Sequence, residues 1–192
     1  MRKGLLVISG VIAVASIAIF VWLKTQSNRK SDVRQFFSQV SRSRILSERD
    51  INFFIEAYPY IKAKLKEKAI GVPLNSLIEI YKVYLSVEKE LKDDEKFKAF
   101  LNKYKINNSR EVFNIIYHIL STYSLVNIEN KYGSIDNFEK ELKKIQGENE
   151  KVTKFIEQIK VVKKETPSAN IQLVKENFDK IQQIVVVTTG SN

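Results

Sequence analysis

The sequence contains no cysteine, and it has only one histidine and one tryptophan among 192 residues. The absence of cysteine excludes disulfide bonds, thiolate zinc sites, a cysteine nucleophile and a lipidated N-terminal cysteine. No Gly-x-Gly-x-x-Gly, P-loop or Gly-x-Ser-x-Gly pattern occurs, so the usual signatures of nucleotide-binding proteins and serine hydrolases are missing. The sequence therefore predicts no catalytic site, no metal site and no cofactor.

Acidic residues are absent from the first 30 positions, which carry five of the basic ones: Arg2, Lys3, Lys24, Arg29 and Lys30. Residues 31–192 hold the other 27 basic and all 22 acidic side chains, so half of the net charge of +10 lies in the first 30 residues. A nucleic-acid-binding domain concentrates basic residues on one face, and the mild excess after residue 30 predicts no nucleic-acid partner. The concentrated charge flanks an apolar run, where a membrane surface explains it better.

That apolar run, residues 4–23, contains no charged residue, and twelve of its twenty residues are Leu, Ile, Val or Phe. A helix of this length is about 30 Å long, which matches the hydrocarbon thickness of a bilayer. Each large apolar residue at mid-helix favours insertion by roughly 0.3–0.6 kcal/mol. We therefore predict a transmembrane signal anchor at residues 1–24, followed by a basic juxtamembrane linker at residues 25–30. Four residues should lie at the membrane interfaces: Arg2, Lys3, Trp22 and Lys24.

A cleaved signal peptide is the alternative, because Ala13-Val14-Ala15 offers a small-residue cleavage site. Cleavage there would leave an apolar mature N-terminus, and the run is longer than the roughly 7–15 residues usual in a secretory h-region. We favour the retained anchor, and the alternative is a secreted or periplasmic helical protein that binds an apolar ligand. The short basic tail before the span favours a cytosolic N-terminus and an extracytoplasmic domain.

Small residues share one face of the predicted span: Ser9, Ala13 and Ser16. Such a face lets two membrane helices approach closely, so self-association of the span is one hypothesis. Ordinary use of small residues in a membrane helix is the commoner explanation.

Residues 31–187 are predicted to form one all-helical soluble domain, a multi-helix bundle of the all-α class, with a flexible tail at residues 188–192. Apolar residues recur at helical spacing throughout, and no alternating strand pattern persists. The pattern predicts helices at about 31–40, 51–58, 74–91, 97–104, 109–130, 135–145, 152–162 and 171–184. Pro59 should kink or restart the second of these. The helix that Ser109 caps has the widest apolar face, which predicts a central position.

Polar residues form a stripe on this central helix: Glu111, Asn114, His118 and Ser121. One interpretation is a ligand-binding groove with His118 as an acid–base group, which would make the chain an enzyme of unfamiliar type centred on Glu111 and His118. The other, which we favour, is the solvent-facing side of an amphipathic helix. The acidic run at residues 93–95 is likewise predicted to be a solvated turn and no ion site.

Tyrosines are frequent on the predicted helices: Tyr58, Tyr60, Tyr81, Tyr84, Tyr117 and Tyr123. They either line an apolar ligand pocket or pack at the margin of the core, and the second use is commoner. We expect a single-pass protein of the cell membrane whose helical domain acts as a non-catalytic protein-binding or scaffold module. Its expected partners are the lipid bilayer and another protein.

Overall fold

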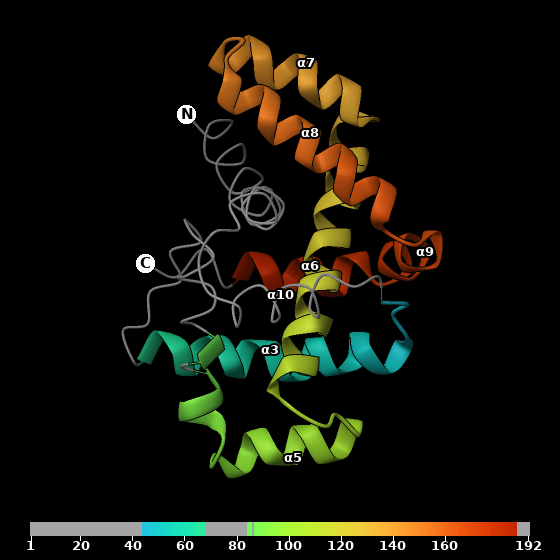
Figure 1. The fold of residues 1–192 in the computed structure, drawn as a ribbon. Coiled ribbons are helices and arrows are strands. Elements are labelled where there is room, and N and C mark those ends of the chain that lie inside the picture. The colour runs from blue at the N-terminus through green and yellow to red at the C-terminus, as the bar shows by residue number, and fades with distance from the viewer. Residues whose placement is uncertain (1–43, 68–83, 86, 188–192) are drawn as a thin grey trace.

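The computed structural model describes residues 44–67, 84–85 and 87–187, and every regular element among them is a helix (Figure 1). This confirms the all-α class. Some predicted features lie outside the described residues. They are the anchor with its interface residues and small-residue face, the linker, the helix at 31–40, most of the helix at 74–91 with Tyr81, and the tail. Within the ranges described, no helix is both long and apolar enough to cross a membrane.

The helices follow one another along the chain with short connections. In order they are α3 (Glu48–Glu67), α5 (Glu95–Tyr104), α6 (Ser109–Tyr132), α7 (Ile135–Gln146), α8 (Glu150–Glu165), α9 (Ser168–Glu176) and α10 (Phe178–Val187). Residues 84–85 and 87–91 are helical as well. The helices after residue 90 therefore lie close to the segments that apolar spacing predicts, apart from the last.

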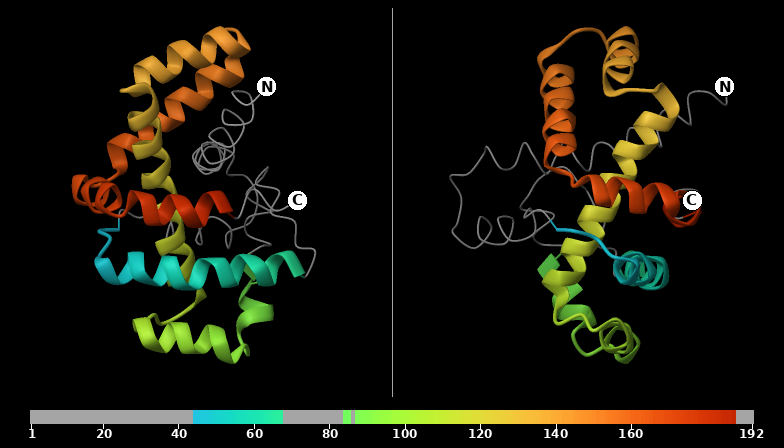
Figure 2. Two further views of the ribbon diagram at one scale, coloured as in Figure 1. Left: turned by 180° about the vertical axis from the view of Figure 1, so that it is seen from behind. Right: turned by 90° about the vertical axis from the view of Figure 1, so that its right-hand side faces the viewer.

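Helix α6 is central, as predicted. Its 24 residues make it about 36 Å long. Helices α3 and α5 lie toward its N-terminal end, α9 and α10 lie near its middle, and the α7–α8 hairpin extends from its C-terminal end (Figures 1 and 2). Because α6 contacts α3, α7, α8 and α9, it is covered on several sides.

Two hydrophobic clusters share α6. The larger one combines α3, residues 87–91, α5, the first part of α6, α9 and α10, and its fully buried large side chains include Phe53, Phe54, Phe97, Ile115 and Ile181. The smaller one joins the C-terminal part of α6 to α7 and α8 through Leu125, Ile128, Ile135, Phe138, Leu142, Val152, Ile156, Ile159 and Val162. Helix α6 thus connects two packed regions.

Helix α3 runs through Pro59 without a break, so the predicted restart is wrong. Proline removes one backbone hydrogen bond and disfavours a helix interior. Here Ala57 and Ile61 are buried in the larger cluster on either side of Pro59, and this packing holds the helix together.

The last predicted helix is two helices. Asn177 interrupts it with a φ of −107° and a ψ of 14°, between α9 and α10. The Asn177 side chain donates to the Leu173 carbonyl at 3.1 Å and to a Glu48 carboxylate oxygen at 3.4 Å. A buried asparagine that bonds to backbone and side-chain oxygens competes with the helical ladder, which explains the break.

The ends of α6 follow local sequence signals. Asn108 is the N-cap, one residue before the predicted Ser109, and its side chain accepts a hydrogen bond from the Glu111 amide at 2.9 Å. Gly133 ends the helix with a φ of 75°, a conformation that glycine adopts without strain. Ser134 then caps α7.

Candidate functional site

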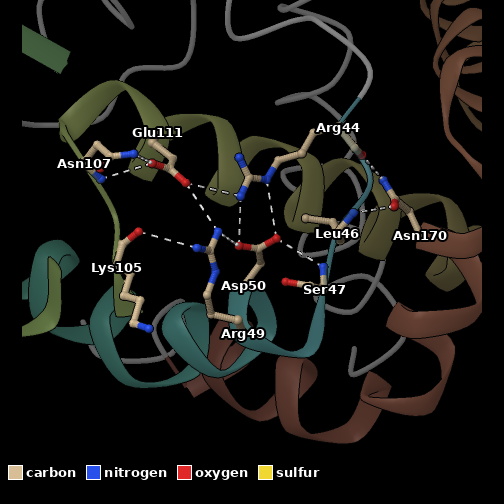
Figure 3. Close-up of polar contacts among 9 residues, drawn as sticks. All are labelled: Arg44, Leu46, Ser47, Arg49, Asp50, Lys105, Asn107, Glu111 and Asn170. Carbon is tan, nitrogen blue, oxygen red and sulfur yellow. Dashed lines mark hydrogen bonds and ion pairs between the residues drawn. The ribbon is translucent and has the colours of Figure 1, made fainter. Parts of the chain in front are cut away.

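The chain enters the described domain at residues 44–47, which we call the entry segment. This segment leads directly into α3 and lies against α6 and α9 (Figure 3). Four charged side chains meet beside it: Arg44, Arg49, Asp50 and Glu111, which we call the junction cluster.

Asn170 on α9 holds the backbone of the entry segment. Its side-chain amide nitrogen donates to the Arg44 carbonyl at 2.7 Å, and its amide oxygen accepts from the Leu46 amide at 2.8 Å. Asn170 is completely buried, and Leu46 is 6% exposed within the larger hydrophobic cluster. A single side chain thereby satisfies both backbone groups that flank Ile45, while Ile45 itself remains 72% exposed.

Asp50 is the centre of the junction cluster, and its side chain is only 2% exposed. It accepts from the Arg44 guanidinium at 2.9 Å and 3.4 Å, from Arg49 at 3.1 Å and from the Ser47 amide at 3.1 Å. Desolvation by burial raises the pKa of Asp50, but the hydrogen bonds and positive charge of the two arginines outweigh it and hold the pKa below its ordinary value. Asp50 is therefore ionised at neutral pH.

The Ser47–Asp50 pair forms half of a capping box. The Asp50 carboxylate accepts the Ser47 backbone amide, while the Asp50 amide donates to the Ser47 carbonyl at 2.9 Å. The carboxylate thus begins α3 and binds the arginines at the same time.

Glu111 is the second carboxylate of the junction cluster. One of its oxygens lies 3.5 Å from Arg44 and 3.4 Å from Arg49, and the other accepts from the Asn107 amide at 3.1 Å. Arg49 also donates to the Lys105 carbonyl at 3.4 Å. Two arginines and two carboxylates neutralise one another and join α3 to the start of α6.

The other members of the predicted polar stripe lie farther along α6. His118 is 8% exposed and Ser121 is 5% exposed, so their predicted solvent-facing position is wrong. The reason is that α6 is packed on several sides, and the buried residues include the unbroken run from Ser121 to Val126. A periodicity that separates one apolar face from one polar face does not describe such a helix.

Tyr117 joins His118 and Ser121 in this buried polar region. The Tyr117 ring packs edge-on against the His118 ring with centroids 5.1 Å apart, and Tyr117 and Ser121 share a side-chain hydrogen bond. Burial raises the pKa of Tyr117 to about 12. The amide oxygen of Asn114 is also buried and has no hydrogen-bond partner in the part of the chain that is described.

Glu111 and His118 therefore belong to different surroundings and do not form an acid–base pair in this structure. Among residues 44–67, 84–85 and 87–187, no group of three or more His, Asp or Glu side chains is arranged to hold a metal ion. The acidic run at residues 93–95 passes from the predicted turn into α5, with Asp93 in the turn and Glu95 as the first residue of the helix. Within it, Asp94 caps α5 by accepting from the Phe97 amide at 2.8 Å, and it accepts from the Tyr60 hydroxyl at 2.6 Å.

The tyrosine rings on the described helices pack against other rings. The ring centroids of Phe54 and Tyr58 lie 4.6 Å apart in a stacked pair. In two further pairs the centroids are 5.3 Å apart, for Tyr84 and Phe113, and 5.1 Å apart, for Tyr123 and Phe178. This packing is the core-margin use that the sequence favours. An open pocket of about 260 Å³ lies elsewhere and is lined by Glu88, Lys92, Phe97, Leu101, Asn108 and Ser109.

Sequence reasoning missed Arg44, Arg49 and Asn170 as members of a site. The Ser-x-x-Asp pattern at Ser47 gives a local signal for Asp50 only. Asn170 is 124 positions from Leu46, and nothing in the sequence near either residue indicates that they are in contact. Comparison of the chain with protein-family models, with curated proteins and with solved structures found no match.

Proposed function

We propose that the chain is a single-pass membrane protein whose helical domain is a non-catalytic protein-binding module on the extracytoplasmic side. The observation that carries the proposal is the fastening of the entry segment. The entry segment is bound by Asn170 through the Leu46 amide and by Asp50 and Glu111 through the Arg44 guanidinium. It follows the N-terminal region that contains the apolar run. The junction cluster and Asn170 therefore lie at the end of the described domain that is nearest in sequence to the predicted anchor.

The charges at the junction favour binding over catalysis. Asp50 and Glu111 are both engaged by arginines, and such carboxylates hold structure and do not present a free base to a substrate. Together with the apolar run at residues 4–23, this supports a tethered module that presents a helical surface to a partner.

Fractionation of cells that make the full-length chain tests the anchor. The full-length protein should stay in the membrane pellet after carbonate extraction. Replacing Val11 and Ile12 with lysine should release it, because two charges at mid-span disfavour insertion by about 5–7 kcal/mol. Thr25→Lys adds a charge outside the span and serves as the control. Release of the unaltered chain, or a mature N-terminus beginning near Ser16, would contradict the anchor.

Sidedness needs a separate measurement. Trypsin added to intact spheroplasts should digest the domain, whose lysines are numerous and exposed, if the domain is extracytoplasmic. Protection of the domain until the membrane is lysed would place it in the cytosol and refute that part of the proposal.

A further inference from the structure

The open pocket of about 260 Å³ lies at the N-terminal end of α6, where residues 88–92 and α5 meet that helix. Pockets for drug-sized molecules have volumes of about 300–1,000 Å³, so this one suits a smaller ligand. None of the residues that line it belongs to the junction cluster. The pocket is therefore a separate feature of the domain.

Ser109 gives this pocket an unused polar group. The residue is 9% exposed, yet its hydroxyl has no hydrogen-bond partner among the described residues. Among the described side chains, only the Asn114 amide oxygen is both shielded from solvent and unpartnered, so solvent reaches the Ser109 hydroxyl. The pocket is the open space that Ser109 borders. Because largely buried polar groups are nearly always hydrogen-bonded, this hydroxyl indicates a partner that enters the pocket.

The groups around Ser109 suit a carboxylate. Ser109 is the first residue of α6, and a helix leaves its first backbone amides without intrahelical partners and its N-terminus partly positive. Lys92 lines the same pocket, is exposed, and forms no ion pair with any residue that the structure describes. An anion in the pocket therefore meets a hydroxyl, a helix N-terminus and an ammonium group.

Glu88 adds a negative charge to the pocket. It precedes Lys92 by four residues, the spacing at which glutamate and lysine commonly pair on a helix. The Lys92 amide donates to the Glu88 carbonyl at 3.1 Å, but the two charged groups form no ion pair. The Glu88 carboxylate bonds to the Tyr84 hydroxyl, and its two oxygens can accept further hydrogen bonds. The pocket thus presents one charge of each sign.

We propose that this pocket binds a small free amino acid with an apolar side chain. Its carboxylate lies at the start of α6 beside Ser109 and Lys92, its ammonium group pairs with Glu88, and its side chain lies against Phe97 and Leu101. A simple carboxylate would bring its charge close to Glu88, and a simple amine would leave Lys92 without a partner. This inference goes beyond the proposed function and does not depend on the membrane anchor.

Isothermal titration calorimetry of the full-length chain in detergent micelles tests the site, with L-leucine as the probe. Saturable binding is expected. Isocaproate lacks the ammonium group of leucine and isoamylamine lacks its carboxylate. Each should bind at least about tenfold more weakly, because it loses a hydrogen bond between charged groups. Absence of saturable binding of L-leucine, or equal affinity for leucine and either analogue, would overturn the proposal.

Substitutions of the two charged residues assign the ends of the ligand. Lys92→Gln should weaken leucine binding at least about tenfold. Lys89→Gln is the matched control, because Lys89 is exposed on the same helical segment and does not line the pocket. Glu88→Gln should weaken the binding of leucine and leave that of isocaproate no weaker. Equal effects of Lys92→Gln and Lys89→Gln would show that the pocket is not the binding site.

Ser109→Ala separates ligand binding from folding. Since the hydroxyl has no partner in the described part of the chain, the midpoint of denaturant unfolding should stay unchanged without ligand. Leucine binding should weaken at least about threefold, because a hydrogen bond to the carboxylate is lost. A lower unfolding midpoint, or unchanged leucine affinity, would contradict the role given to Ser109 and with it the placement of the ligand.

Discussion

Asn170 and Leu46 lie 124 positions apart in the sequence, yet the Asn170 side-chain oxygen accepts the Leu46 backbone amide at 2.8 Å in the interior of the domain. The same side chain donates to the Arg44 carbonyl, so the C-terminal helix pair and the N-terminal entry segment are fastened together. A buried backbone group that loses its only partner destabilises a protein more than a lost surface contact does. The energetic importance of Asn170 follows from this asymmetry.

Asn170→Ala should lower the free energy of unfolding by about 2–6 kcal/mol, because each of the two backbone groups that it leaves unsatisfied costs about 1–3 kcal/mol. Denaturant unfolding of the full-length chain, followed by helical circular dichroism, measures the change. Gln172→Ala, an exposed substitution on the same helix, is the control and should change the free energy by no more than about 0.5 kcal/mol. Equal effects of the two substitutions would show that the Asn170 contacts do not stabilise the domain.

Asp50 should make the domain sensitive to acid. Desolvation raises the pKa of Asp50, but the arginine contacts outweigh it, so the folded-state pKa lies below the ordinary 3.8 and the unfolded chain binds the proton first as the pH falls. The stabilisation is complete above the ordinary pKa and disappears as the pH falls through the lower, folded-state value.

The substitution Asp50→Asn should therefore lower stability by about 1–3 kcal/mol at pH 7, since it removes hydrogen bonds to charged groups. It should also flatten the acid side of the stability profile. Unfolding measured at a series of pH values tests both effects, with the exposed Asp179→Asn on α10 as the control. An acid profile that Asp50→Asn leaves unchanged would contradict the assigned pKa direction.

Tyr117 should be among the last tyrosines to ionise. Burial raises its pKa to about 12, so its contribution to tyrosinate absorbance should be missing near pH 10 and should rise well above that pH. In Tyr117→Phe the late part of the alkaline titration should lose amplitude. Because the unfolded chain releases this proton at lower pH, the raised pKa also means that stability falls as the pH rises above about 10. A loss of amplitude near pH 10 in the variant would refute the burial of this hydroxyl.

The sequence predicts most of the helices because their determinants are local. A few neighbouring residues determine the boundary between α6 and α7 at Gly133 and Ser134, and they also give α6 its wide apolar face. The continuity of α3 through Pro59 is not, because it depends on packing of Ala57 and Ile61 against distant elements.

The site was far less predictable than the fold. The polar stripe on α6 includes Glu111, but the two arginines that bind it come from residues 44–50, and no pattern in the sequence joins them to Glu111. The burial of His118 was missed because α6 is enclosed on several sides, so its buried residues do not follow one face. Polar side chains on a central helix therefore cannot be assigned to solvent from periodicity alone.

The smaller hydrophobic cluster should unfold with some independence from the larger one, because α6 is the helix that both share. Ile159 on α8 is completely buried in the smaller cluster, and Ile159→Ala should cost about 2–5 kcal/mol through lost contacts and a new cavity. Val161→Ala on the same helix is the matched control, since Val161 is 39% exposed, and it should cost much less. Hydrogen exchange should then show faster exchange in α7, α8 and the end of α6, while α3 and α5 keep their protection. Uniform acceleration across all of these helices would mean that the two clusters unfold as one cooperative unit.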